Sequence, residues 1–278
     1  MSAAIDALGT SPLPATGSRA RLGAYARWQV RDYLMDRGAP TALVGLLFGY
    51  MVGGPMVGSM NMSLVRMSPA AIARAGGLDA ARASMVTELT SSFLTVALGN
   101  LVFLGALFAM NGIVANDRKL GYYRFLFSKP ISPARYYGQA FVLHWAGFLF
   151  VTSILGLLYQ ALVGPVLGAP LYAAVALLYL CYAGIAFALS AAARWDWLSL
   201  VAVTVAANYL WLRYGNAHGP LSALLYLLPP LHRTSEVYSA VAGGHALPWP
   251  LLGWFAGYGA VSFAIGLVVL RFRRMAIV

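Results

Sequence analysis

Long stretches without a charged side chain are the feature that most constrains this 278-residue chain. No Asp, Glu, Lys or Arg occurs in the ranges 38–65, 89–116 and 136–193. An α-helix needs about 20 predominantly apolar residues to cross the hydrocarbon core of a bilayer. The first two stretches each have room for one such helix, and the third has room for two. The sequence therefore predicts an all-α integral membrane protein.

The composition supports a lipid-facing surface. Hydrophobic residues make up 60% of the chain and charged residues only 10%, whereas an average soluble domain carries about 25% charged residues. The formal net charge of +11 is spread over short clusters between apolar runs, and no nucleic-acid-binding motif accompanies it. We therefore expect a lipid membrane as a partner of this chain, and no nucleic acid.

About six transmembrane helices account for the apolar runs, with five or seven as the alternatives. The pairs Gly164-Pro165 and Ala169-Pro170 divide the longest uncharged stretch, because Gly and Pro favour turns. The expected spans are 41–61, 91–114, 139–162, 171–192, 197–214 and 250–270. Together they form a domain over 41–271, which follows a cytoplasmic segment, 1–40, and precedes a cytoplasmic tail, 272–278.

The positive-inside rule gives the orientation. A cytoplasmic N-terminus leaves most of the 19 Lys and Arg residues on the cytoplasmic side. The basic residues that then lie outside are Arg66, Arg74, Arg82, Arg213 and Arg233. We expect both termini in the cytoplasm and the protein in the plasma membrane.

Three segments beside the spans also carry structural signals. Residues 19–37 combine an apolar stripe with two arginines four residues apart, which predicts an interfacial amphipathic helix before the first span. Residues 64–88 are expected to form a largely helical outer loop. Residues 215–249 form a second outer segment, whose apolar part is broken at Pro229-Pro230 and is too short to cross the bilayer. That part fits a re-entrant or a surface helix.

The sequence lacks the motifs of the common catalytic sites. No G-x-x-x-x-G-K-[S/T] phosphate loop, H-E-x-x-H, C-x-x-C or G-x-S-x-G motif occurs. The expected spans contain no carboxylate, and their one ionisable group well inside a span is His144, for which we favour a neutral packing role over a proton or metal role. The single cysteine, Cys181, is expected to be a packed core thiol. We expect no cofactor or metal in this chain and no ATPase activity of its own.

The basic loop 116–140 between the second and third spans is the most informative segment. Gly121 and Pro130 bracket a short stretch, 122–127, that has room for about two helical turns, and Pro130 and Pro133 favour its end. A short helix held between two spans is suited to moving with a cytoplasmic partner. A loop that only enforces topology and touches anionic lipid is an equal alternative from these residues alone.

This loop resembles the intracellular loop of the ABC-2 type permeases, the transmembrane domains of type V-like ABC exporters. In that family the loop has an acidic-basic pair, a Gly, an apolar stretch, Pro-aliphatic-Ser, a basic residue and often Tyr-x-Gly-Lys, of which this chain has Gln139 in place of the Lys. The matching positions here are Asp117, Arg118, Gly121, Leu126, Pro130, Ile131, Ser132, Arg135, Tyr136 and Gly138. The six-span layout, the N-terminal interfacial helix and the Arg-rich C-terminal end also resemble the family.

The resemblance implies a permease that works with a separate ATPase. Two permease chains, identical or different, would associate with two ATP-binding cassette subunits, which bind ATP and Mg²⁺. The loop would be a cytoplasmic coupling helix docked on the ATPase. Its coupling residues would be Asp117, Arg118, Gly121, Tyr122, Arg124, Phe125, Leu126 and Pro130.

The resemblance also implies export along a path between the spans. That path would be lined by the first, second and fifth spans, which makes Asn100, Asn111 and Asn208 the candidate pathway residues. An amphiphilic, lipid-like, glycan or peptide substrate would suit it. The alternatives are a membrane-embedded lipid-modifying enzyme, for which the outer residues His218, His232, Arg233, Glu236 and His245 are the densest polar group, and a channel or assembly subunit.

Overall fold

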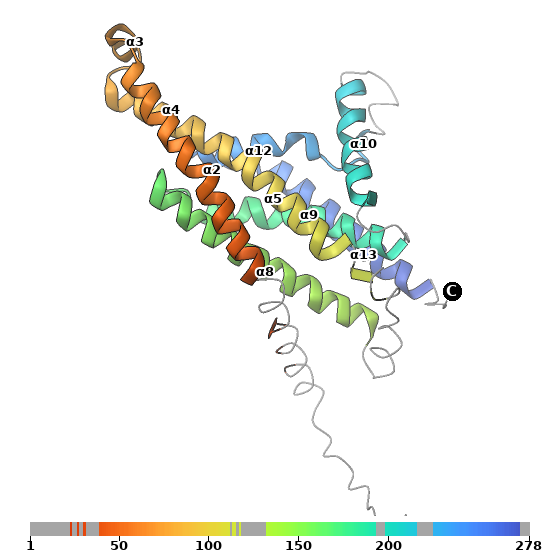
Figure 1. Ribbon diagram of the computed structural model, residues 1–278. Coiled ribbons are helices and arrows are strands. Elements are labelled where there is room, and N and C mark those ends of the chain that lie inside the picture. The colour runs from red at the N-terminus through yellow and green to blue at the C-terminus, as the bar shows by residue number, and fades with distance from the viewer. Residues whose placement is uncertain are drawn as a thin grey trace, which may run out of the picture.

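The computed structural model describes residues 23, 27, 30, 31, 39–111, 113, 114, 117, 132–192, 198–215 and 225–272. These residues are mostly helical, and no β-strand occurs among them. Four helices in this part of the chain are long and apolar enough to cross a membrane: Leu78–Met110, Pro133–Leu162, Ala169–Ala192 and Trp249–Phe272. For the described residues, the prediction of a helical protein with several helices that could span a membrane is confirmed (Figure 1).

The first long helix, α2, covers Ala39–Arg66 and has 28 residues. It continues without interruption through Pro55 and packs against α8 and α4. Before it, residues 23, 27, 30 and 31 are helical and exposed. The rest of the expected interfacial helix, 19–37, lies outside the described residues.

The second span belongs to a helix that starts earlier than expected. After the short helix α3 (Pro69–Arg74), α4 (Leu78–Ser92), η2 (Phe93–Leu98), α5 (Gly99–Ala106) and η3 (Leu107–Asn111) follow one another without a break. Gly76 and Gly77 have φ values of 84° and 109°, which favour glycine and separate α3 from α4. The hydropathy of the sequence locates only the apolar half of this helix, because the charged residues before residue 91 do not end it.

The remaining long helices follow the expected spans closely. Ser132 caps α8 (Pro133–Leu162), with Pro133 in its first turn, where proline is tolerated because the first backbone N–H groups have no partner within the helix. Helix α9 covers Ala169–Ala192, α10 covers Leu198–Tyr214 and α13 covers Trp249–Phe272. Helix α8 thus begins six residues before the expected start at 139, at its capping serine.

Helix α9 is the centre of the bundle and packs most closely on α13. The two helices cross at Gly184 and Gly259, where a Cβ on either residue would overlap the backbone of the opposite helix. Further along, a Cβ on Gly266 would lie 2.7 Å from the ring of Phe187. Small residues let the backbones approach and so supply van der Waals contact that lipid cannot replace. Helices α5, η3, α8, α10 and α12 contact α9 as well.

The second outer segment returns to the bundle. Pro229 and Pro230 precede a 3₁₀ turn, η4 (Leu231–Arg233), and then α12 (Thr234–Ala242). Val237 and Tyr238 of α12 are buried, and the helix packs against α4, η2 and α9. One face of α12 is therefore part of the protein interior.

Candidate functional site

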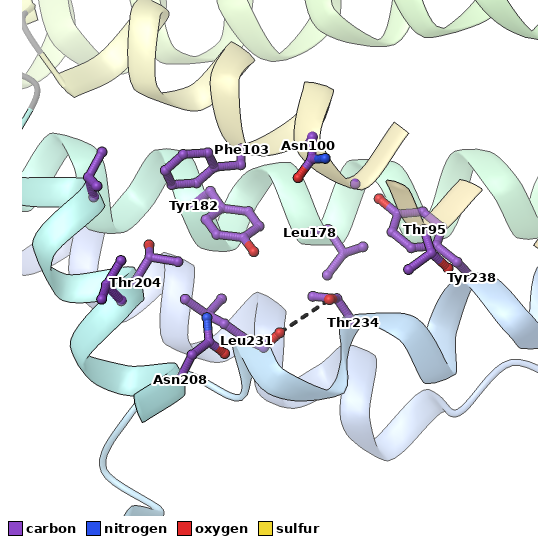
Figure 2. Close-up of a pocket in the computed structure, with 13 residues that line it drawn as sticks. Thr95, Asn100, Phe103, Leu178, Tyr182, Thr204, Asn208, Leu231, Thr234 and Tyr238 are labelled. Carbon is purple, nitrogen blue, oxygen red and sulfur yellow. Dashed lines mark hydrogen bonds between the residues drawn. The ribbon is translucent and has the colours of Figure 1, made fainter. Parts of the chain in front are cut away.

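A cavity of about 320 Å³ lies among the helices of the bundle (Figure 2). Its walls come from the η2–α5 part of the second long helix, from α9, from α10 and from the η4–α12 segment. The lining residues are Thr95, Gly99, Asn100, Phe103, Leu178, Tyr182, Val201, Thr204, Val205, Asn208, Leu231, Thr234 and Tyr238. In the part of the chain that the structure describes, no residue of α2 lines it.

The cavity wall is polar without being charged. Hydroxyl groups come from Thr95, Tyr182, Thr204, Thr234 and Tyr238, and amide groups from Asn100 and Asn208. Among the described residues that line the cavity, none is Asp, Glu, Lys, Arg or His. Hydroxyl and amide side chains both donate and accept hydrogen bonds. The cavity can therefore bind polar groups of either kind without carrying a net charge.

Two hydroxyl groups of this wall have no hydrogen-bond partner among the described residues: those of Thr204 and Tyr238. Tyr238 is only 1% exposed. Thr234, by contrast, donates to the carbonyl of Leu231 at 3.1 Å. Most buried polar groups in folded proteins have a partner, so two unpaired hydroxyls beside the same cavity distinguish it from ordinary packing space.

The local structure of the second long helix shapes this wall. η2 and η3 are π-helical segments, and such segments often occur at functional sites because each changes the direction in which the following side chains point. η2 contains Thr95 and comes directly before Gly99 and Asn100. A Cβ on Gly99 would lie 3.3 Å from the Tyr238 ring. The glycine thus leaves room for Tyr238 at the edge of the cavity.

The structure brings together two of the three candidate pathway residues. Asn100 and Asn208 lie on different helices, α5 and α10, and line the same cavity. Asn111 is in η3, and its side chain lies outside the described residues. Of the first, second and fifth spans that were expected to line a pathway, the second and fifth form two walls of this cavity, while α9 and the η4–α12 segment form the others.

The cavity-lining residues of α10 follow a helical spacing that can be read from the sequence. Val201, Thr204, Val205 and Asn208 are spaced by three or four residues, so they lie on one face of α10. That pattern was available before the structure. The contribution of Tyr238 could not be predicted in this way, because nothing in the sequence places α12 against the second long helix.

A second polar contact lies at the end of the bundle that carries Asp117. The hydroxyl of Tyr137, at the start of α8, donates to Oδ2 of Asp117 at 3.0 Å. Beside it, the backbone N–H of Val114 donates to Oγ of Ser190 at 3.1 Å. Val114 and Tyr137 share a buried cluster with Phe187, Ala191 and Leu270. The chain just before the expected coupling helix is thus anchored to three other helices.

The other predicted coupling residues lie outside the described residues. They are Arg118, Gly121, Tyr122, Arg124, Phe125, Leu126 and Pro130. Of the predicted set, only Asp117 can be placed, and it is helical and partly buried. Sequence reasoning missed its partner Tyr137, although an aromatic hydroxyl at the start of the next span was visible.

The ionisable residues of the outer segment have separate environments. Arg233 and Glu236 form an exposed ion pair, with Nε and Oε1 2.7 Å apart, and their hydrogen bonds lower the pKa of Glu236 and raise that of Arg233. His232 instead stacks on Trp211, with ring centroids 4.2 Å apart. Burial lowers the pKa of His232, and the nearby Arg233 lowers it further.

The described members of this group do not assemble into a metal centre. His245 is exposed, and His218 lies outside the described residues. Within the described ranges, no three His, Cys, Asp or Glu side chains lie close enough to hold a metal ion.

The two remaining candidates inside the spans have packing environments. Nδ1 of His144 lies 2.7 Å from the carbonyl oxygen of Ala140, one turn earlier on α8. Because a carbonyl only accepts, Nδ1 carries the proton in this contact. Cys181 is a free, fully buried thiol in the main core. Both environments agree with the packing roles expected from the sequence.

No protein-family model matches this chain, and no curated protein sequence matches it.

Proposed function

We propose that this chain is the permease subunit of an ABC-2 type transporter, driven by a separate ATP-binding cassette ATPase. The observation that carries the proposal is the uncharged polar cavity among apolar helices, to which Asn100 and Asn208 contribute from different helices. A permease needs a polar site inside its membrane domain. The absence of a phosphate-loop motif from the sequence agrees with an energy source in another subunit.

The proposed topology has six spans with both termini in the cytoplasm. Helix α2, with 28 residues, and α10, with 17 residues, would join the four long apolar helices. At 1.5 Å per residue they are about 42 Å and about 26 Å long, against a hydrocarbon core of about 30 Å. The shorter α10 fits with slight local thinning of the bilayer. The exposed helical residues 23, 27, 30 and 31 support an interfacial helix before α2.

The proposed coupling runs through the loop 116–140. Its first described residue, Asp117, is hydrogen-bonded to Tyr137, and Val114 and Tyr137 belong to a cluster with residues of α9 and α13. A displacement of the loop by the ATPase would therefore act on α8, α9 and α13 through buried contacts. In the proposed assembly the ATPase binds ATP and Mg²⁺, and a second permease chain completes the transporter in the plasma membrane.

Co-purification tests this proposal directly. The tagged chain is expressed with its neighbouring genes and isolated in mild detergent, and we expect an ATPase with a phosphate-loop motif to be isolated with it. The paired substitution Arg118→Glu with Leu126→Asp, in the loop, should remove the ATPase. Arg82→Glu, which makes the same charge reversal as Arg118→Glu but on an exposed face of α4, should retain it.

Two results would contradict the proposal. One is a chain that is isolated alone whichever nucleotide is present. The other is an ATPase that stays bound to the loop variant as well as to the wild type, which would place the contact elsewhere.

A further inference from the structure

We propose that the cavity between α5, α9, α10 and α12 binds an uncharged amphiphile whose polar part carries hydroxyl or amide groups. This inference deepens the proposed permease function, and it depends on that function only for the ligand to be a transported substrate. The binding itself is argued from the cavity alone.

The lining determines the charge of the ligand. Seven of its side chains carry a hydroxyl or an amide: Thr95, Asn100, Tyr182, Thr204, Asn208, Thr234 and Tyr238. Among the described lining residues none can neutralise an ionic group, and an ion without a partner among apolar helices is strongly unfavourable. A neutral ligand avoids that cost and still uses the hydrogen-bonding groups of the wall.

The unpaired hydroxyls are the groups of the wall that would gain hydrogen bonds from a polar ligand, once small side-chain movements bring their buried oxygen atoms into contact with it. Thr204 and Tyr238 have no hydrogen-bond partner among the described residues, and they lie at opposite ends of the cavity, with the Asn100 side chain between them (Figure 2). A ligand with several hydroxyl or amide groups can satisfy both ends at once. The cavity of about 320 Å³ is at the small end of ligand pockets, which suits a compact polar group.

The edge of the cavity explains why the ligand is an amphiphile. Asn100 on α5 and Val205 on α10 line the cavity and are also exposed. One turn further on the same helices, Leu104 and Tyr209 are 39% and 60% exposed. An apolar chain can therefore rest against this exposed surface while the polar group occupies the cavity. The edge between α5 and α10 is the entry route from the bilayer.

Photolabelling with three matched probes tests the inference. The purified full-length chain is placed in nanodiscs of a zwitterionic phospholipid and exposed to a diazirine-bearing monoacylglycerol, which is uncharged and has two hydroxyl groups. The fatty acid and the alkyl trimethylammonium with the same diazirine chain are the anionic and cationic comparisons. Mass spectrometry then locates the labelled peptides. We expect the monoacylglycerol, but not the charged probes, to label α5 and α10 beside the cavity, and unlabelled monoacylglycerol to compete.

Substitutions in the wall connect the label to the cavity. Asn208→Leu removes an amide and should weaken competition by unlabelled monoacylglycerol about tenfold, as loss of the hydrogen bonds of one side chain does. Tyr238→Phe and Thr204→Val each remove or replace one unpaired hydroxyl and should weaken it about threefold to fivefold. Gln160→Leu, on an exposed part of α8 away from the cavity, is the matched control and should leave it unchanged.

Equal labelling by all three probes, or labelling spread over every lipid-facing helix, would overturn the inference. Unchanged competition in Tyr238→Phe and Thr204→Val would overturn it as well. These two variants retain the shape of the wall, so they provide the test even if Asn208→Leu fails to fold. The assay contains no ATPase. Failure of the permease proposal therefore leaves its result intact, and failure of binding leaves the co-purification result intact.

Discussion

At the scale of single residues, two buried tyrosines provide opposite tests of the polar contacts. Tyr137 and Tyr238 are each 1% exposed, but the Tyr137 hydroxyl donates to Asp117, whereas that of Tyr238 has no partner among the described residues. Tyr137→Phe should lower the free energy of unfolding by about 1–2 kcal/mol, because a hydrogen bond to a carboxylate is lost. Tyr238→Phe should leave it unchanged or raise it.

Thermal unfolding of both variants in the same detergent checks this pair, since each substitution removes one oxygen atom and keeps the ring. A fall in stability for Tyr238→Phe as large as that for Tyr137→Phe would mean that its hydroxyl is paired in the unliganded protein. The argument for an unsatisfied cavity wall would then fail.

Asp117 itself separates a structural role from a role in coupling. Asp117→Asn retains an oxygen that accepts from Tyr137 but removes the negative charge. We expect the free energy of unfolding to change by less than about 1 kcal/mol. Co-purification of the ATPase should fall, because the proposed coupling role needs the negative charge of Asp117 at the ATPase. Unfolding and co-purification are measured on the same preparation. A large loss of stability would instead show that the charge is needed within this chain.

At the scale of helices, the crossing of α9 and α13 depends on two glycines. A Cβ on Gly184 would overlap the carbonyl oxygen of Gly259, which is backbone and cannot rotate away. Gly184→Ala should therefore separate the helices and lower the free energy of unfolding by about 3 kcal/mol or more. Gly257→Ala, on an exposed face of α13 with no atom near its Cβ, should be neutral or stabilising, because alanine favours helix.

Thermal unfolding and the elution profile of each variant in detergent provide the comparison. If Gly184→Ala is tolerated as well as Gly257→Ala, the close approach of the two helices is not what holds the centre of the bundle together.

The helices also show how far sequence reasoning extends. The expected spans 171–192 and 250–270 match α9 and α13 within two residues, because their apolar runs end where the helices end. Residues 64–88 were expected to be largely helical, but the continuity of the helix from Leu78 into the second span was not predicted, because a hydropathy profile marks only the apolar part of a helix. The packing of α12 was also beyond the sequence, because it depends on contacts with α4, η2 and α9, which are distant in the chain.

At the scale of the complete fold, the cavity also combines residues that the sequence identifies with residues that it does not. Asn100 and Asn208 were identifiable as polar residues within apolar runs, and the structure places both on one cavity. The contribution of Tyr238 depends on contact between residues that are far apart in the chain, and spacing within one helix carries no information about such a contact. Sequence alone therefore identifies the polar residues of a site more readily than the distant segments that complete its wall.

The topology of the whole chain is open to a direct test, because its only cysteine, Cys181, is fully buried and provides an unreactive background. A cysteine is placed in turn at four exposed positions: Gly23→Cys, Ala83→Cys, Ser132→Cys and Ser235→Cys. With six spans, a membrane-impermeant maleimide added to intact cells should label the Ala83 and Ser235 variants. The Gly23 and Ser132 variants should react only after permeabilisation.

Two of the proposed spans, α2 and α10, are not among the four long apolar helices, and each is tested by one pair of positions. Two spans, α8 and α9, lie between residues 132 and 192, so these two residues are on the same side. If α10 does not cross, no span separates 192 from 235, and residue 235 lies on the same side as residue 132. If α2 does not cross, residue 23 lies on the same side as residue 83. Labelling of all four variants in intact cells would instead indicate that the impermeant reagent entered, so a cytoplasmic protein with a reactive cysteine is included as the control. The four results together decide between the six-span topology and each smaller one.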